Sequence, residues 1–289
     1  MNRLIVNADD FGLTAGVNRA IVELNRAGVL TSTTLMARAA ATEEAIEMAL
    51  ATPSLGVGCH VVLVDGEPVL ATRREIPHLA DPGTGRFQPK LPAFLRRVYP
   101  FGRASRSFVR EIEAEAAAQI DLLQKRGLRL THIDTHKHTH MFPAVLRPVL
   151  RAARAAGIRA VRNPFEPKWS LRATPGAPWV RRTEVSLLRL LEPAFRRIVA
   201  EEGFTTTDGA VGALATGTLD AATVMSLASA LPDGTFELVS HPGYNDAELA
   251  RAHTRLLASR EIERDALQVL KEFASLELIS FAQIDSPDD

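Results

Sequence analysis

Residues 4–12 read LIVNADDFG, an apolar run that ends in two adjacent carboxylates. The run has the length of a buried strand, which places Asp9 and Asp10 at its carboxyl end. A helical pattern follows over residues 18–27 and stops at Gly28, a residue typical of helix C-termini. A buried strand followed by a helix is the repeating unit of a parallel sheet.

The same alternation continues along the chain. We predict further strands at 30–36, 55–62, 128–135, 158–162, 204–207, 235–240 and 276–281. We predict further helices at 42–51, 105–126, 143–156, 182–202, 219–231 and 246–273. Pro148 and Pro193 lie inside two of these helices, where we expect a kink or a break. Seven or eight such units without a composition break predict an α/β fold, a closed or nearly closed barrel of parallel strands formed by residues 1–289 as one domain.

Two stretches rich in Pro and Gly, at about 65–105 and 163–180, interrupt the alternation. We expect loop insertions there, which either wall a substrate cleft or lie on the surface.

Composition limits the classes of partner and compartment. Lys plus Arg and Asp plus Glu both number 34 in the 289 residues, so the net charge of zero gives no case for a nucleic-acid partner. Cys59 is the single cysteine, which excludes an intramolecular disulfide and is typical of a reducing compartment. We find neither an export signal nor an apolar run of the roughly 18–20 residues that a membrane span needs. We therefore expect a cytoplasmic protein without an integral membrane segment.

Polar residues stand at the carboxyl ends of the predicted strands. They are Asp9 and Asp10, His60, Asp134 and His136, Arg162 and Asn163, and His241. The carboxyl ends of barrel strands form one rim, where catalytic residues normally lie. We therefore expect these side chains to converge on one site, although His60 alone would be read as an ordinary core residue.

Residues 132–140 contain four of the eight histidines of the chain. His132, Asp134, His136, His138 and His140 alternate with other residues and would share one face of an ideal strand. Met141-Phe142-Pro143 opens a helix, so the cluster is expected to divide between metal ligands, residues that orient them, and substrate contacts. The alternative is a polar loop with incidental histidines.

Two imidazoles and one carboxylate with open positions are typical of catalytic zinc, whereas magnesium prefers more oxygen ligands. Asp9 and Asp10 would point to opposite sides of a regular strand, so one could bind a metal while the other accepts a proton. The simpler reading of the pair is a helix cap or turn. A histidine at the rim, such as His241, is suited to act as a general acid near neutral pH.

Five segments, taken in order along the chain, resemble one known family. They are VNADDFGLTAGVN at 6–18, TSTTLM at 31–36, GCHVVL at 58–63, HIDTHKHTHMFP at 132–143 and SHPG at 240–243. Together they resemble the YdjC-like carbohydrate deacetylases, which include the chitooligosaccharide and hopanoid-biosynthesis types. The resemblance implies a distorted TIM-like barrel and metal-dependent removal of N-acetyl groups from amino sugars. Cys59 departs from the apolar residue expected there, but a buried cysteine behaves as a small hydrophobe.

The resemblance also implies roles for individual residues. One divalent ion, zinc or magnesium, would be held by Asp10, His60 and His136. Asp9 would be the general base, His241 the acid and Arg162 an orienting cation. The remaining candidates, as second-shell or substrate-contacting residues, are Asp134, His138, His140 and Asn163.

The implied substrate is an N-acetylated sugar, either an oligosaccharide or a glycolipid such as an N-acetylglucosaminyl hopanoid, and a homodimer is possible. Four aromatic residues of the insertions could stack on a sugar ring or an apolar aglycone, or serve as ordinary packing: Phe87, Phe94, Trp169 and Trp179. One alternative is another metal hydrolase, such as a phosphoesterase or cyclic amidase, with a second metal on His138 and His140. The other is an inactive sugar-binding relative.

Overall fold

The computed structural model describes residues 2–71, 74–174, 176–252 and 254–284. Its central strand is β1 (Asn2–Phe11), which pairs in parallel with β2 (Ser32–Leu35) on one side and β8 (Gly234–Ser240) on the other. The sheet continues as β6-β5-β4-β3-β2-β1-β8-β7, and β9 also pairs with β1. Every pairing between these strands is parallel.

The remaining strands are β3 (Gly56–Val61), β4 (Ile133–Thr135), β5 (Ala160–Val161), β6 (Thr205–Thr206), β7 (Gly209–Val211) and β9 (Glu277–Leu278). The α-helices are α1 (Ala15–Arg26), α2 (Thr42–Leu50), α3 (Leu91–Val98), α4 (Arg106–Lys125), α5 (Pro143–Ala155), α6 (Lys168–Ala173), α7 (Trp179–Leu188), α8 (Glu192–Glu201), α9 (Ala221–Ser229), α10 (Ala247–Arg251) and α11 (Ser259–Ala266). The 3₁₀ helices are η1 (Pro100–Gly102), η2 (His136–Met141), η3 (Arg189–Leu191), η4 (Leu267–Glu272) and η5 (Phe281–Gln283).

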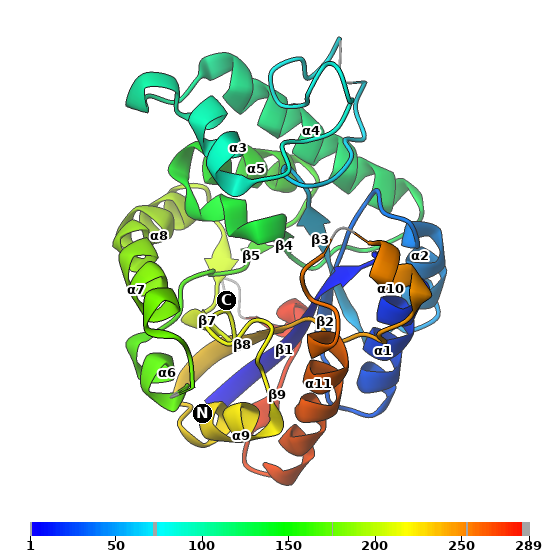
Figure 1. Cartoon of the computed structure of the whole chain (residues 1–289), viewed down its shortest axis with the longest axis vertical. Helices are drawn as coiled ribbons and strands as arrows, with labels where there is room; N and C mark the ends of the chain where they lie inside the picture. Colours follow the sequence, from blue (N-terminus) through cyan, green and yellow to red (C-terminus); the bar gives the residue numbers. More distant parts are fainter. Residues whose placement is uncertain (1, 72–73, 175, 253, 285–289) are drawn as a thin grey trace.

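The strands surround a common interior and the helices form an outer ring (Figure 1), which confirms the predicted distorted (β/α) barrel. The two ends of the strand order are β6 and β7, which are neighbours in sequence. Beside this seam, the Ala210 amide of β7 donates to the Phe165 carbonyl at 3.2 Å. The barrel is therefore distorted at β6–β7, where the described residues form no strand ladder.

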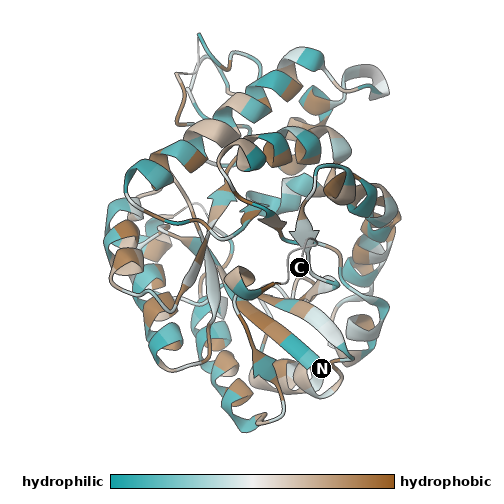
Figure 2. Ribbon diagram, turned by 180° about the vertical axis from the view of Figure 1, so that it is seen from behind, coloured by the Kyte–Doolittle hydropathy of each residue, from teal (hydrophilic) through white to brown (hydrophobic). Residues whose placement is uncertain are grey.

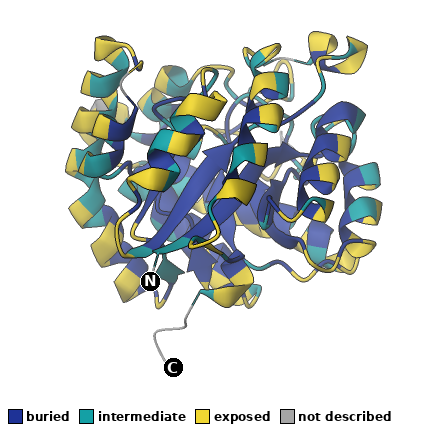
Figure 3. Cartoon of the chain, turned by 90° about the horizontal axis from the view of Figure 1, so that it is seen from below, coloured by how far each residue is buried: buried dark blue, intermediate teal, exposed yellow. Residues whose placement is uncertain are grey.

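Apart from the short strands β6 and β9, the strands are largely buried on both faces, as expected of a parallel sheet covered by helices. Residues 4–11 of β1 are all buried. Figure 3 shows the strands as buried and the outward surfaces of the helices as exposed. Figure 2 shows hydrophobic stretches along the central strands and hydrophilic residues spread over the outer helices. Toward the amino ends of the strands, Ile5, Ala160, Ile279 and Phe281 pack together as a small apolar cluster.

Several predicted elements differ from the structure. The strand β7 was not predicted, because three residues carry no periodic signal. The predicted helix at 182–202 is instead α7, η3 and α8, and Pro193 lies in the first turn of α8, where proline is tolerated. The predicted helix at 246–273 divides into α10, α11 and η4.

The two insertions are also more ordered than predicted. The first contains α3 and η1, and the second contains α6. Helix α5 runs through Pro148 without a break. Among the described residues, no helix combines the length and apolarity that crossing a bilayer requires.

Candidate metal centre and active site

A cavity of about 860 Å³ opens at the carboxyl ends of the strands, where the sequence predicted convergence. Its lining includes six of the predicted site residues: Asp9, Asp10, His60, His136, His138 and His241. They come from β1, β3, η2 and the segment after β8. Residues that are up to 232 positions apart in sequence therefore face one cavity because the parallel topology brings the strand ends together.

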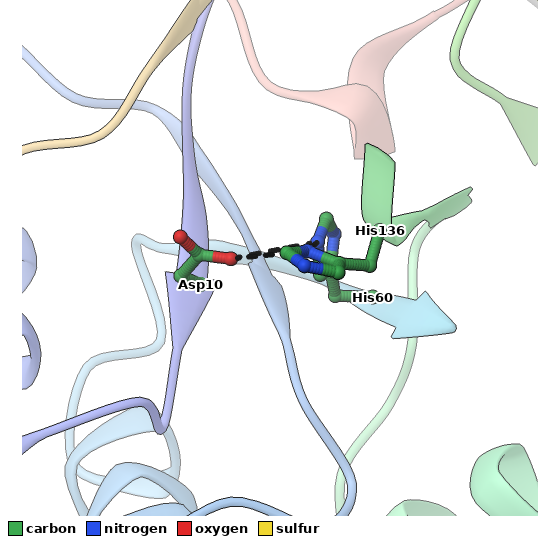
Figure 4. Close-up of side chains that lie close together, drawn as sticks. All are labelled: Asp10, His60 and His136. Carbon is green, nitrogen blue, oxygen red and sulfur yellow. Dashed lines mark hydrogen bonds and ion pairs between the residues drawn. The ribbon is translucent and has the colours of Figure 1, made fainter. Parts of the chain in front are cut away.

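Three donor atoms in this cavity form a nearly equilateral triangle (Figure 4). His60 Nε2 lies 3.6 Å and His136 Nδ1 lies 3.5 Å from Asp10 Oδ1, and the two ring nitrogens are 3.2 Å apart. Ligands about 2.0–2.1 Å from a tetrahedral ion lie roughly 3.3–3.4 Å from one another. The triangle therefore has the size of one face of a tetrahedral zinc site, and these three residues could hold a metal ion.

Asp134 fixes the orientation of the His60 ring. His60 Nδ1 donates to Asp134 Oδ1 at 2.8 Å, which leaves the lone pair of Nε2 directed toward Asp10 and His136. This is the carboxylate–histidine arrangement that orients metal ligands. Burial by itself would lower the pKa of His60, but Asp134, Asp9 and Asp10 raise it to about 9. The ring therefore needs a cation, either a proton or a metal ion, among these carboxylates.

The backbone around the cavity is unusual. Among the described residues, four that are not glycine have a positive φ, namely Asp10, Asp65, Lys137 and His138. All four line the cavity. Such conformations cost of order 1–3 kcal/mol each and cluster at functional sites. At Asp10, with φ of 65°, the β1–β2 register shifts, and the carboxylates of Asp9 and Asp10 both reach the cavity instead of opposite faces of a regular strand.

Arg162 lies fully buried among three carboxylates. Its two Nη atoms donate to Asp9 at 2.9 and 2.6 Å, its Nε donates to Glu237 at 2.8 Å, and it also pairs with Asp134. Burial would raise the pKa of Asp9, but Arg162 and His60 lower it overall. Glu237 is affected differently, since burial, Asp9 and Asp134 outweigh Arg162 and raise its pKa to about 7.

Two further ion pairs hold the other side of the cavity. The buried Arg260 donates from Nη2 to Asp10 Oδ2 at 2.7 Å. Together with His136 and His60 it keeps the pKa of Asp10 well below its ordinary value, against the effect of burial. The buried Glu263 accepts from the His241 amide at 2.6 Å and lies 3.6 Å from His241 Nδ1. Burial would lower the pKa of His241, but Glu263, Asp9 and Asp10 raise it.

Some predicted residues lie outside the cavity lining. His140 is buried, with Nδ1 paired to Thr135 Oγ1 at 2.8 Å and Nε2 to the Arg162 carbonyl at 3.2 Å. Asn163 binds the Thr207 carbonyl and the Phe165 amide, so it shapes the turn after β5. His132 lies deeper in the barrel, stacked on Phe281 at 3.8 Å between ring centroids.

The four aromatic candidates from the insertions are absent from the described lining of the cavity. Phe87 and Phe94 are buried in the core, and Phe94 packs against Phe108. These two are therefore not available for a sugar ring. Trp169 packs edge-on against Phe236, and Trp179 is exposed on α7.

Four functional candidates were missed in the sequence, namely Thr34, Glu237, Arg260 and Glu263. The Thr34 hydroxyl lies 3.1 Å from His60 Nδ1 and 3.4 Å from Asp9 Oδ1. Glu237 carried a usable signal, a lone acid in the apolar strand TFELVS. Arg260 and Glu263 carried none, because they stand among many charged residues in the predicted helix at 246–273.

Comparison with known proteins gives consistent matches. The family model described as YdjC-like protein matches residues 3–277. A carbohydrate deacetylase of Thermoanaerobacter pseudethanolicus is 28% identical over 278 residues, which cover 94% of this chain and 95% of that protein. A carbohydrate deacetylase of Brevibacillus brevis is 44% identical over 151 residues, which cover 52% of this chain but only 55% of that protein.

Solved structures agree on the fold. A protein of Enterococcus faecalis described as a putative cellobiose-phosphate cleavage protein superposes with a TM-score of 0.76 at 25% identity, covering 97% of this chain and 98% of that one. A lactam utilization protein of Thermus thermophilus has a TM-score of 0.53 at 15% identity, over 96% and 99% of the two chains, and shares the fold alone.

Proposed function

The chain belongs to the YdjC-like protein family, and from that premise we propose that it is a metal-dependent hydrolase that removes an N-acetyl group from an amino sugar. The observation that carries the proposal is the triangle of Asp10, His60 and His136 facing the same cavity as Asp9 and His241. The names of its relatives, which are carbohydrate deacetylases, support the substrate class.

In the proposed reaction, water adds to the acetyl carbonyl carbon and the carbon–nitrogen bond breaks, which yields acetate and a free amine. A bound dication would lower the pKa of a water molecule toward about 7 and polarise the acetyl oxygen. Asp9 would accept the proton of the attacking water. The pKa of Asp9 is lowered, so the carboxylate is ionised at neutral pH, and a weak base suffices for so acidic a water.

His241 would donate a proton to the departing nitrogen. Its Nε2 lies 3.9 Å from Asp9 Oδ2, so the proposed acid and base lie side by side at the cavity. Glu263, Asp9 and Asp10 raise the pKa of His241, which favours the protonated ring that an acid requires. Arg162 would hold Asp9 in place through its bidentate contact. His138, whose Nδ1 is buried at the cavity without a hydrogen-bond partner in the described part of the chain, would contact the substrate.

The donor set supports zinc over magnesium. Two imidazoles and one carboxylate suit zinc, whereas magnesium favours oxygen ligands about 3.0 Å apart around an octahedron. A second metal is not supported. His138 and His140 belong to no metal-binding group among the described residues. In the group of Asp9, His60 and Asp134, both carboxylates already pair with Arg162.

The substrate is proposed as an N-acetylated oligosaccharide or glycolipid, which a cavity of about 860 Å³ can accommodate in part. We also propose a cytoplasmic location, which the single, buried cysteine supports.

The test separates the two adjacent aspartates. We expect Asp9→Asn to lower acetate release from a panel of N-acetylglucosaminides by at least about a hundredfold while zinc content stays near one per chain. Asp10→Asn should lose the zinc itself. Acetate release and metal content are measured on both variants, with circular dichroism to confirm folding.

If Asp9→Asn loses the metal and Asp10→Asn keeps it, the two roles are reversed. Tight sugar binding without acetate release across the whole panel would instead indicate an inactive relative. Two zinc ions per chain would favour the two-metal hydrolase.

A further inference from the structure

Helix α7 presents an apolar stripe to solvent. None of the ten side chains of α7 is buried. Trp179 is 77% exposed, Leu187 60%, and Leu190, in the adjoining η3, 78%. Val180 is 48% exposed, and Thr183 completes the stripe. At 100° per residue these five positions span about 100° of one helix face, so the exposed apolar groups form one continuous surface.

The surroundings of this stripe are strongly basic. Residues 168–197 contain seven Lys and Arg and two Glu, which gives +5 in a chain whose total is zero. Arg181 and Arg182 bind backbone carbonyls of Ala213, Ala177, Leu171 and Thr174, so their charges are not neutralised by these contacts. Arg189, Arg196 and Arg197 pair with Glu192 or Glu201, whereas Lys168 and Arg172 of α6 are exposed. The stripe therefore lies within a local positive potential.

Helix α7 stands between the stripe and the active site. Arg181, on the inward side of α7, lines the cavity that contains Asp9 and His241. Figure 1 shows α7 at the outer edge of the barrel, with α6 and α8 on either side. A surface that covered the stripe would therefore be separated from the cavity by the thickness of α7.

We propose that α7 docks on an anionic lipid bilayer, with Trp179, Leu187 and Leu190 inserted at the interface and the exposed cations of the neighbouring α6, Lys168 and Arg172, facing the headgroups. Exposed tryptophan and leucine on one helix face, with cations around them, is the pattern of interfacial helices. A second copy of the chain fits less well, because an isologous interface would bring two segments of charge +5 against each other. The proposal does not depend on the proposed reaction.

Vesicle binding tests the proposal directly. Vesicles of phosphatidylcholine and phosphatidylglycerol in equal parts should co-sediment with the protein, whereas pure phosphatidylcholine vesicles should bind at least about tenfold more weakly, and added salt should release the protein. The chain has two tryptophans. In a Trp169→Phe background, the emission of Trp179 should shift to the blue when anionic vesicles are added.

The double variant Leu187→Ser/Leu190→Ser should lower the vesicle partition coefficient at least about tenfold. The matched control is Leu50→Ser/Ile262→Ser. It removes two exposed apolar side chains from other helices, Leu50 of α2 (53% exposed) and Ile262 of α11 (51% exposed). Far-ultraviolet circular dichroism and urea denaturation report that each variant is folded.

Three results would overturn the proposal: no binding to anionic vesicles, an equal loss in the control variant, or a dimer in sedimentation equilibrium that Leu187→Ser/Leu190→Ser converts to a monomer. The last result would assign the stripe to a second copy.

Discussion

Asp134 acts on the proposed metal site through another residue. It lies outside the triangle of proposed ligands, yet its carboxylate sets which nitrogen of His60 carries the proton. Arg162 keeps this acid ionised: burial alone would raise the pKa of Asp134, but Arg162 and His60 lower it. Arg162, which follows β5, therefore influences through Asp134 how well the His60 ring can bind a metal ion.

We expect Asp134→Asn to weaken zinc binding by about 10–100-fold, because the His60 ring loses the partner that orients it. A competition titration with a chromophoric chelator measures the affinity. The matched control is Glu237→Gln, since Glu237 also pairs with Arg162 but does not hold the His60 ring. An equal loss in both variants would mean that Arg162, rather than the His60 orientation, controls the affinity.

Zinc affinity should also depend on pH in a defined direction. The pKa of His60 without metal is raised to about 9, so below that pH a proton competes for Nε2. The affinity should therefore fall by about tenfold for each pH unit as the pH drops from about 9 toward 7. In Asp134→Asn the pKa of His60 should move down toward its ordinary value, and the dependence over this range should flatten. An affinity independent of pH in the unaltered protein would contradict the assignment of His60 as a ligand.

At the scale of elements, β3 and β4 can lie side by side here only because residue 58 is glycine. A Cβ atom on Gly58 would lie 2.5 Å from Cε1 of the buried His132 ring. The ring cannot withdraw easily, because it is stacked on Phe281 beneath it and bound to Thr131 Oγ1 at 2.9 Å. The register of β3 and β4 that aligns His60 with Asp134 thus depends on the missing side chain.

Gly58→Ala should lower the free energy of unfolding by roughly 1–3 kcal/mol, the usual cost of overpacking a filled interior. Urea denaturation measures the effect. Gly176→Ala is the control, because a Cβ atom there meets nothing within 4 Å and should change stability by less than about 0.5 kcal/mol. In a His132→Ala background the cost of Gly58→Ala should largely disappear; if it persists, the ring is not the obstacle.

How far the sequence predicts the elements depends on their length and regularity. The strands β1 to β3 and β8 and the helices α1, α2 and α4 were predicted to within a few residues, because each has a clear apolar pattern. The strands β5, β6 and β9 are two residues long, and their positions depend on tertiary pairing. Helix α3 begins at Leu91-Pro92 within a Pro-rich stretch, where the prolines concealed a helix start.

At the scale of the whole molecule, the interior of this barrel is polar except for the apolar cluster of Ile5, Ala160, Ile279 and Phe281. A typical (β/α) barrel fills its interior with layers of branched apolar side chains. Here Arg162, Asp9, Asp134, Glu237 and His60 occupy the corresponding space, all of them buried. The sequence predicted that polar strand ends would converge, because that follows from parallel topology. It could not predict which acid would pair with which cation, because those partners come from different strands.

The buried neutral histidines predict sensitivity to acid. Burial lowers the pKa of His132 and of His140 to about 3, whereas an unfolded histidine titrates near 6.5. Between these values the unfolded chain binds protons that the folded chain does not, so stability falls as the pH falls from about 6.5 toward 3. Each of the two residues should contribute about 1.4 kcal/mol per pH unit to this slope.

Urea denaturation between about pH 6 and pH 4 measures the slope. A His132→Gln variant should show a slope smaller by about 1.4 kcal/mol per pH unit. An unchanged slope would show that His132 titrates in the folded protein as it does in the unfolded chain.

The sharing of Arg162 by Asp9, Asp134 and Glu237 has a consequence for how such chains diverge. Loss of the guanidinium alone would leave three buried acids without their cation. Loss of one acid would change the charge balance of Arg162 and the two remaining acids. Single replacements at these positions should therefore be rare in related chains. A replacement of Arg162 should instead be accompanied by a replacement of one of the acids. A homologue without an arginine at the position of Arg162 should also lack at least one of the three acids, a correlation that an alignment of the family can test.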